Sequence, residues 1–330
     1  MSATSAARPV VRVAVVGACG WAGSRQLEAF RAVGARVTAI VDEDPRAADL
    51  ARRLGARVAR ADELEPGDVD LVVVALPTQV QPDVCALLLA RGLRVLCEKP
   101  VGADLGAVAA LGVQRRAREN LAVGYMLHHH PFFGAFTSWA ARADVRAVRI
   151  RTVAHKDEVT AWRADASGGG VVVVNAVHAL ELVGAAVPGE VEVLDAWSSS
   201  GLYGSGVPEL VHASYRIGGA VHVQLETYWS PWLNDEGLND RDFDLEIDAV
   251  ATGSRRHWRN WTLRSWDRGE RERVDLVEPL DLFAAQARSA LDFARGGPPD
   301  VGIEAAVAPI ELATSINELL ADDRRTVGTR

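Results

Sequence analysis

Lysine is rare in this sequence, and one of its two lysines follows a hydrophobic run. Of 36 Lys plus Arg residues, only Lys99 and Lys156 are lysine. Unlike arginine, a buried lysine can lose its proton near neutral pH. The segment VLCEKP predicts a buried parallel strand ending at Lys99, at the sheet edge where open α/β sheets bind ligands, and Pro100 favours an extended backbone there. Lys99 is therefore a candidate for proton exchange with a substrate hydroxyl.

A glycine-rich segment, VVGACGWAG, predicts a turn between a strand and a helix. Its glycines, Gly17, Gly20 and Gly23, are spaced GxxGxxG rather than GxGxxG. Such a turn lets a diphosphate approach the amide groups of the helix N-terminus. Asp42 ends the next predicted strand, where an acidic residue binds the ribose hydroxyls of an adenine dinucleotide. The two features together predict a dinucleotide cofactor.

The residues after this strand bear on the choice between NAD and NADP. Asp42, Glu43 and Asp44 form an acidic cluster that should repel a 2′-phosphate, which favours NAD. Arg46 follows two residues later and could instead bind that phosphate. We therefore expect NAD, with NADP left open.

A histidine on an apolar segment is the second candidate for chemistry. In GGGVVVVNAVHALEL, a helix over 171–184 would place Val174 and Asn175 about one turn before His178, near one face. His178 is then either a residue that positions substrate and shares a proton with Lys99, or a structural residue of the core. Lys156 is a reserve candidate for proton transfer, because the strand before it could bring its amine to the same place.

Composition excludes several classes of function. A 330-residue chain with 48% hydrophobic and 24% charged residues is typical of a globular protein. The net charge of −8, without a basic stripe, argues against a nucleic-acid partner. No apolar run is long enough to span a membrane, and the N-terminal region has no apolar signal core. The three cysteines lack CxxC spacing, which fits reduced thiols. We therefore expect a cytoplasmic protein. His128, His129 and His130 are consecutive and would point apart, so we expect no metal site; Tyr125 and His129 are candidates to border the substrate pocket.

The elements that must position these residues predict an α/β fold of two domains. Residues 11 to about 100 alternate Val-rich runs with helical segments, which indicates a doubly wound parallel sheet. Beyond residue 124 the runs alternate apolar and polar residues, and Gly218-Gly219 joins two of them in a predicted hairpin. We expect a Rossmann domain over 1–124 and an α+β domain with an open, largely antiparallel sheet over 125–330.

Six segments, taken in order, resemble the glucose-fructose oxidoreductase, inositol dehydrogenase and MocA family along the whole chain. They are VVGACGWAG, IVDEDPRAA, VVVALPTQVQPDV, VLCEKPVGADL, VGYMLHHHPFFGAF and WRADASGGGVVVVNAVHALEL. The resemblance implies a nicotinamide cofactor at the cleft between the domains, sugar or cyclitol substrates, and a homodimer or homotetramer formed through the second sheet.

The motifs and the resemblance together assign the site residues. Catalysis falls on Lys99 and His178, while Lys156, Asn175, Tyr125 and His129 are further candidates for catalysis or substrate binding. The expected cofactor contacts are Gly17, Ala18, Cys19, Gly20, Trp21, Ala22, Asp42, Leu76, Pro77, Thr78, Gln81, Glu98, Lys99, Trp162 and Arg163.

The sequence departs from the family at two positions. Val174 replaces the acidic residue one turn before the histidine, and Gln81 stands where the family commonly has histidine. We expect an NAD(P)-dependent oxidoreductase acting on a secondary alcohol or ketone of a sugar or cyclitol. The departure at Val174 keeps two alternatives open: reduction of a C=N bond or a redox-neutral reaction with retained NAD, and a regulatory nucleotide-binding protein without catalysis.

Overall fold

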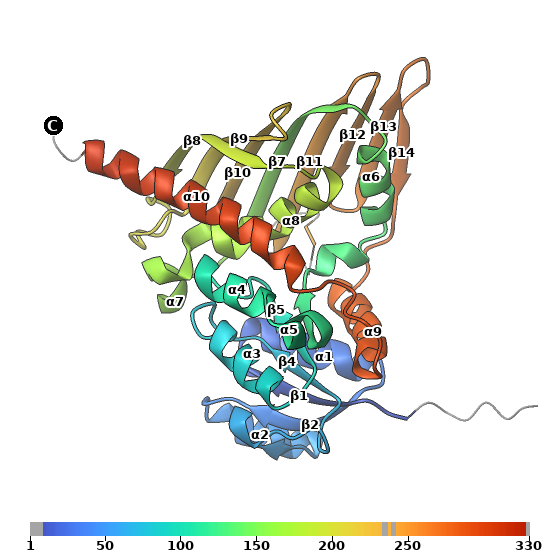
Figure 1. Ribbon diagram of the computed structural model, residues 1–330, viewed down its shortest axis with the longest axis vertical. Helices are drawn as coiled ribbons and strands as arrows, with labels where there is room; N and C mark the ends of the chain where they lie inside the picture. The colour runs from blue at the N-terminus through green and yellow to red at the C-terminus, as the bar shows by residue number, and fades with distance from the viewer. Residues whose placement is uncertain (1–8, 233–236, 239–241, 328–330) are drawn as a thin grey trace, which may run out of the picture.

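The computed structural model describes residues 9–232, 237–238 and 242–327, and it contains two sheets stacked end to end (Figure 1). The first, sheet A, is built by the N-terminal part of the chain and the second, sheet B, by the later part. The expected α/β architecture with a parallel sheet and a largely antiparallel second sheet is confirmed.

Sheet A is six-stranded and parallel, in the order β3-β2-β1-β4-β5-β6. Its strands are β1 (Arg12–Val16), β2 (Arg36–Val41), β3 (Arg57–Val58), β4 (Leu71–Val74), β5 (Val95–Glu98) and β6 (Leu121–Gly124). The helices of this part are α1 (Trp21–Ala32), α2 (Arg46–Leu54), α3 (Gln81–Ala90), α4 (Leu105–Gly112) and α5 (Arg115–Asn120), with a short 3₁₀ turn, η1 (Ala61–Glu63). The central strands β4 and β5 are buried at every residue, as continuous apolar runs require. The strand order reverses between β1 and β4, and ligands bind at such a switch point.

Sheet B is eight-stranded, in the order β14-β13-β12-β11-β7-β10-β9-β8, and all its strand pairs are antiparallel except the parallel pair β7–β10. Its strands are β7 (Val145–His155), β8 (Val191–Ser199), β9 (Leu210–Ile217), β10 (Val221–Ser230), β11 (Phe243–Ala251), β12 (Ser254–Arg259), β13 (Thr262–Asp267) and β14 (Arg273–Leu276). The predicted hairpin is present between β9 and β10, where Gly218 and Gly219 adopt φ of +58° and +70°. Burial alternates along β9 and β10, so one face of the sheet is packed and the other is open.

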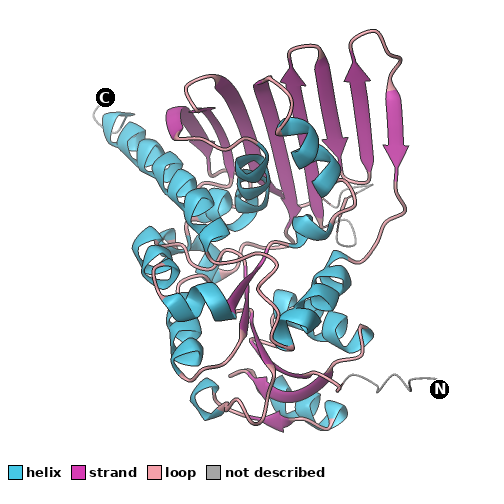
Figure 2. Cartoon of the chain, turned by 45° about the vertical axis from the view of Figure 1, so that its right-hand side comes forward, coloured by secondary structure: helices cyan, strands magenta, loops and turns pink. Residues whose placement is uncertain are grey.

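Helices cover the packed face of sheet B, and one of them returns to the Rossmann part (Figure 2). The later helical segments are η2 (Met126–His129), α6 (Phe133–Ala140), α7 (Ala161–Ala164), η3 (Ala166–Gly168), η4 (Val172–Ala176), α8 (Val177–Ala186), α9 (Leu282–Ala294) and α10 (Glu304–Val327). Helix α9 packs against α1, and the Val123 amide of β6 donates to the carbonyl of Val301 (2.9 Å). Because the end of the chain packs on sheet A in this way, the division at residues 124 and 125 stays a prediction.

The predicted helix over 171–184 differs in its first turn. Residues Val172–Ala176 form a π-helical turn, η4, and the α-helix α8 begins at Val177. Such turns are rare in proteins, and those that occur often lie at functional sites.

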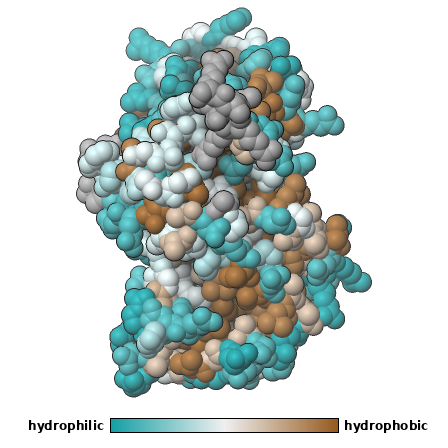
Figure 3. All heavy atoms as spheres, turned by 90° about the vertical axis from the view of Figure 1, so that its left-hand side faces the viewer, coloured by the Kyte–Doolittle hydropathy of each residue, from teal (hydrophilic) through white to brown (hydrophobic). Residues whose placement is uncertain are grey.

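The surface mixes polar and apolar residues. Figure 3 shows a narrowing between the two parts, with apolar residues gathered on the lower, Rossmann part of that face. Among the described residues, no helix combines the length and the apolar character that a membrane span requires.

Candidate active site in the cleft between the sheets

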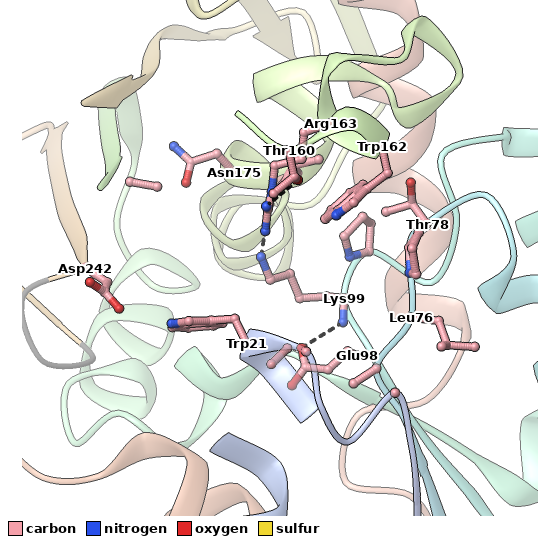
Figure 4. Close-up of a pocket in the computed structure, with 18 of the residues that line it drawn as sticks. Trp21, Leu76, Thr78, Glu98, Lys99, Thr160, Trp162, Arg163, Asn175 and Asp242 are labelled. Carbon is pink, nitrogen blue, oxygen red and sulfur yellow. Dashed lines mark hydrogen bonds between the residues drawn. The ribbon is translucent and has the colours of Figure 1, made fainter. Parts of the chain in front are cut away.

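A cleft of about 520 Å³ lies where the carboxyl ends of the sheet A strands meet sheet B. Both parts of the chain line it, together with Phe283 of the returning helix α9. Figure 4 shows Lys99 extending from the end of β5 toward helix α7, which carries Trp162 and Arg163. The cleft therefore brings sequence motifs that are far apart in the chain into one site.

The glycine loop forms one wall of this cleft. Gly17 has φ of +81°, and a Cβ there would lie 2.2 Å from the carbonyl oxygen of Ala75. At Gly23 a Cβ would lie 1.9 Å from the carbonyl oxygen of Gly17. Helix α1 begins after Gly20 without a side-chain cap, so its first-turn amides are left for a ligand. This arrangement fits the diphosphate of a dinucleotide.

The predicted contacts of this loop are nearly all at the cleft. Gly17, Cys19, Gly20, Trp21 and Ala22 line it. Ala18 does not, because its side chain is buried behind the loop.

In the acidic cluster after β2, one of the three residues is paired with an arginine. Asp42 lines the cleft, and its two carboxylate oxygens accept hydrogen bonds from the backbone amides of Cys19 (2.7 Å) and Asp44 (2.9 Å). Arg46 pairs with Asp44 at 2.6 Å, and its hydrogen bonds lower the pKa of Asp44 to about 2. Glu43 is exposed and does not line the cleft. Asp44 and Arg46 line the cleft as well but are paired with each other, so Asp42 is the acidic residue of this cluster that we expect to meet a ribose.

The segment after β4 contributes Leu76, Pro77 and Thr78 to the cleft, but not Gln81. The Gln81 amide is committed to the backbone: its Oε1 accepts from the Leu76 amide (3.2 Å), and its Nε2 donates to the carbonyl of Pro100 (2.6 Å). Gln81 thus supports the two loops at the cleft from behind, which differs from the predicted cofactor contact.

Lys99 occupies the end of β5, as the sequence predicts. The cis peptide Lys99-Pro100 follows the strand, and the Nζ of Lys99 donates to the carbonyl of Val174 (3.0 Å). Burial lowers the pKa of Lys99 to about 8. Burial raises the pKa of its neighbour Glu98, which also lines the cleft and accepts a hydrogen bond from Gln26 (2.6 Å). The Lys99 amine can therefore bind or release a proton near neutral pH.

The π-helical turn presents Val174 and Asn175 to the cleft, and His178 follows on α8. The Asn175 amide nitrogen donates to the hydroxyl of Thr227 (3.0 Å), which fixes the side chain against sheet B. Burial lowers the pKa of His178 well below its usual value, and its Nδ1 is buried without a hydrogen-bond partner among the described residues. His178 is therefore neutral at pH 7 in this state.

Two further cations line the cleft, Lys156 after β7 and Arg163 on α7. The Nζ of Lys156 donates to the carbonyl of His155 (2.7 Å), and burial together with the charge of Arg163 lowers its pKa to about 8. Arg163 donates to the hydroxyl of Thr160 (2.9 Å) and lies 4.3 Å over the ring of Trp162. Burial lowers the pKa of Arg163 to about 10. Lys99, Lys156 and Arg163 therefore share one cleft.

Tyr125 and His129, expected to border the substrate pocket, do not line the cleft. Tyr125 is fully buried, with its ring 6.0 Å from that of His178, and burial raises the pKa of its hydroxyl. His129 lies 3.6 Å from Asp300 at the end of the chain's return to sheet A, and burial lowers its pKa.

The histidines on either side of His129 have different neighbours. His128 bonds to Glu181 (2.8 Å), and His130 stacks on Trp261. No group of metal-binding side chains occurs among the described residues.

Several residues at the cleft carry no motif in the sequence. Met126, Ala154, Thr160, Trp229, Asp242, Phe243 and Phe283 all line it. Only Trp229 stands in a stretch, ETYW, whose aromatic density is visible in the sequence.

The N-terminal part matches the family model described as the oxidoreductase family with an NAD-binding Rossmann fold, over residues 11–125. The chain is similar to a myo-inositol dehydrogenase of Streptomyces leeuwenhoekii, with 35% identity over 43% of this chain and 41% of that protein. It is also similar to an inositol 2-dehydrogenase of Rhizobium meliloti, with 30% identity over 37% of this chain and 38% of that protein. These matches thus span about two-fifths of the relatives' length.

A solved structure extends the comparison to the whole fold. An inositol dehydrogenase homologue of Azotobacter vinelandii, complexed with NAD⁺, superposes with a TM-score of 0.78 and 17% identity, over 96% of each chain. At this identity the likeness concerns the fold. Together, the family model and the similar inositol dehydrogenases identify residues 11–125 as the NAD-binding Rossmann domain of the glucose-fructose oxidoreductase, inositol dehydrogenase and MocA family, and the shared fold extends over the whole chain.

Proposed function

We propose that this protein is an NAD-dependent oxidoreductase that acts on a secondary alcohol or ketone of a sugar or cyclitol. The observation that carries the proposal is the placement of Lys99: a buried amine with a pKa of about 8 lies on the same cleft as the glycine loop. The family and the inositol dehydrogenases among the relatives support the same class of substrate.

The cleft would hold the cofactor in a defined orientation. The α1 N-terminus and Gly20 would bind the diphosphate, and Asp42 would accept the hydroxyls of the adenosine ribose. When bound, the nicotinamide accepts a hydride from an alcohol carbon or donates one to a carbonyl carbon. The end of β5 would then place Lys99 beside the reacting oxygen.

In alcohol oxidation, Lys99 takes the hydroxyl proton while the C–H hydride leaves the same carbon, so that a carbonyl remains. In reduction, the ammonium of Lys99 returns that proton to the oxygen. His178 and Asn175 border the same space and would position the substrate hydroxyls. His178 lacks an acidic partner at Val174, so an imidazolium formed there would not be charge-stabilised. Proton transfer therefore rests mainly on Lys99.

The acidic charge at Asp42 supports NAD over NADP. Arg46, the residue that could bind a 2′-phosphate, is instead paired with Asp44.

The apolar side chain of Val174 at the cleft also favours a second candidate, the reduction of a C=N bond or a redox-neutral reaction with retained NAD. Imine substrates need less acid assistance than ketones. A nucleotide-binding regulator without catalysis is disfavoured by Lys99.

We further propose a homodimer or homotetramer formed through the open face of sheet B. Trp197 on β8 is 58% exposed there and lies beside paired charges such as Arg151 with Glu226. An aromatic residue among such pairs is typical of an interface. A cytoplasmic location is supported by three cysteines that are all unpaired.

The test is to denature the purified protein, measure the NAD(H) released, and assay turnover on polyols, ketosugars and imines. We expect NAD(H) to bind and a polyol or ketosugar to be turned over. Binding of NAD(H) without turnover of any substrate would instead favour the regulatory alternative, and absence of NAD(H) binding would refute the proposal.

A further inference from the structure

The two lysines of this arginine-rich chain lie on the same cleft. Lys99 follows β5 of sheet A, and Lys156 follows β7 of sheet B. Arg163 on α7 brings a third cation to the site. Each of the two lysines is lowered in pKa partly by the charge of Arg163, which places these charges within electrostatic reach of one another. These like charges repel one another, and an anionic ligand in the cleft would offset that repulsion.

None of the three cations forms an ion pair with a described carboxylate. Lys99 and Lys156 donate to backbone carbonyls, and Arg163 donates to the Thr160 hydroxyl. The Nε of Arg163 is buried and has no hydrogen-bond partner in the part of the chain that the structure describes. An unpaired donor of this kind in a buried site is costly unless a ligand accepts from it.

Three carboxyl groups attract these lysines, although burial still lowers the pKa of each amine. Asp157 and Asp242 attract Lys156, and Asp157 also lies 3.2 Å from the Nε2 of His155. Glu98 attracts Lys99, yet burial raises the pKa of that carboxyl, which disfavours its charged form.

The backbone holds Lys156 firmly at the cleft. Its amide donates to the carbonyl of Ser230 at the end of β10 (2.9 Å), and its carbonyl accepts from the hydroxyl of Tyr203 (2.7 Å). The ammonium is therefore presented from a fixed point of sheet B rather than from a free loop.

The phosphates of a dinucleotide have a separate place. Helix α1 and the glycine loop lie on the sheet A side, and an uncapped helix N-terminus binds a diphosphate without help from sheet B. Lys156 follows β7 of sheet B and Arg163 lies on α7, so neither cation belongs to this helix N-terminus. An additional anion is thus expected beside the substrate.

We propose that Lys156 and Arg163 form a subsite for an anionic group of the substrate, a carboxylate or a phosphate carried by the polyol or ketone. This inference rests on the proposed function, because it assigns the substrate of the same cleft. Lys99 remains beside the reacting oxygen, while the anion anchors the other end of the molecule.

The experiment uses three hexoses that differ at C6: glucose, glucuronate and glucose 6-phosphate. NADH binding is measured first, by its fluorescence, and each hexose is then titrated into the NADH complex at pH 7 and constant ionic strength. We expect glucuronate or glucose 6-phosphate to bind at least tenfold more tightly than glucose. Which anion is preferred identifies the carboxylate or the phosphate. If neither anion binds more tightly than glucose, the inference is wrong, whereas failure of NADH to bind would refute the proposed function itself.

Two variants at position 156 test whether Lys156 causes the preference for an anionic hexose. Lys156→Met should abolish the preference for the anion, and Lys156→Arg should retain it. Raising the pH from 7 to 9 should weaken the preference more in the parent protein, where Lys156 has a pKa of about 8, than in Lys156→Arg, because arginine holds its proton to a higher pH. Thermal melting of each variant checks folding. A preference that survives in folded Lys156→Met, or that is lost equally in Lys156→Arg, would overturn the assignment.

Discussion

Replacing Asp42 by asparagine should shift the cofactor preference from NADH toward NADPH. The Asp42 carboxylate lines the cleft and is held by the amides of Cys19 and Asp44. Arg46 is attracted by this charge, but its guanidinium is hydrogen-bonded to Asp44 rather than to Asp42. A 2′-phosphate on the ribose would therefore meet a fixed negative charge.

The size of the effect follows from the surroundings of this carboxylate. Two unit charges 4 Å apart interact by about 1 kcal/mol in water and by about 4 kcal/mol at an effective dielectric constant of 20. Asp42 is half-buried, so the repulsion lies between these limits. We expect the parent protein to bind NADH at least tenfold more tightly than NADPH, which is about 1.4 kcal/mol. Asp42→Asn keeps the shape of the side chain and should remove most of this difference.

The assay is a fluorescence titration with each cofactor, which can also follow quenching of Trp21 at the cleft. Glu43→Gln is the matched control, because it removes an equal charge at the next position from a side chain outside the cleft. The reasoning is refuted if the parent protein binds NADPH as tightly as NADH. It also fails if Glu43→Gln shifts the ratio as much as Asp42→Asn.

Two other predictions concern the scaffold. Gly23→Ala should lower the melting temperature by several degrees and weaken NADH binding, because its Cβ would lie 1.9 Å from the carbonyl oxygen of Gly17. The control Gly184→Ala, where a Cβ on α8 would meet open space, should do neither. Equal melting and binding in both variants would contradict the account of the loop. Light scattering at micromolar concentration should give a dimer or tetramer, and Trp197→Arg should weaken it; a monomeric parent protein would rule out the interface on sheet B.

The parts of the site that the sequence predicts are those set by local spacing. Asp42 and Lys99 each follow a buried strand, and the carboxyl ends of parallel strands meet at one edge of the sheet. Asn175 and His178 follow from helical spacing after the triple glycine. Such residues need no knowledge of how distant segments pack.

The rest depends on contacts between distant segments. Phe283 reaches the cleft because α9 returns to pack on α1, and Asp242 and Trp229 reach it through the register of sheet B. Gln81 has the right place in the sequence, but its amide is used by the backbone of two loops. The direction that a side chain takes at such a position is decided by its neighbours in space.

The start of the helix before His178 is a further example. A period of 3.6 residues predicts an α-helix there, and the structure has a π-helical turn over Val172–Ala176. The carbonyl of Val174 at this turn accepts the hydrogen bond from Lys99. The π-helical turn thus occurs together with a hydrogen bond between Lys99 and Val174, which are distant in the sequence, and the local sequence pattern does not reveal that hydrogen bond.

The most direct test of the account is the pH dependence of turnover in the parent protein, Lys99→Met and His178→Ala, on a substrate identified by the panel and at saturating cofactor. Because the neutral amine accepts the proton, the rate of alcohol oxidation in the parent should rise from pH 6, reach half its maximum near pH 8, the pKa of Lys99, and level off only at higher pH. Lys99→Met should lose at least ~10²-fold in kcat together with this dependence, and His178→Ala should lose less and keep it. Near-normal turnover in folded Lys99→Met, with the rise still present, would contradict the central claim.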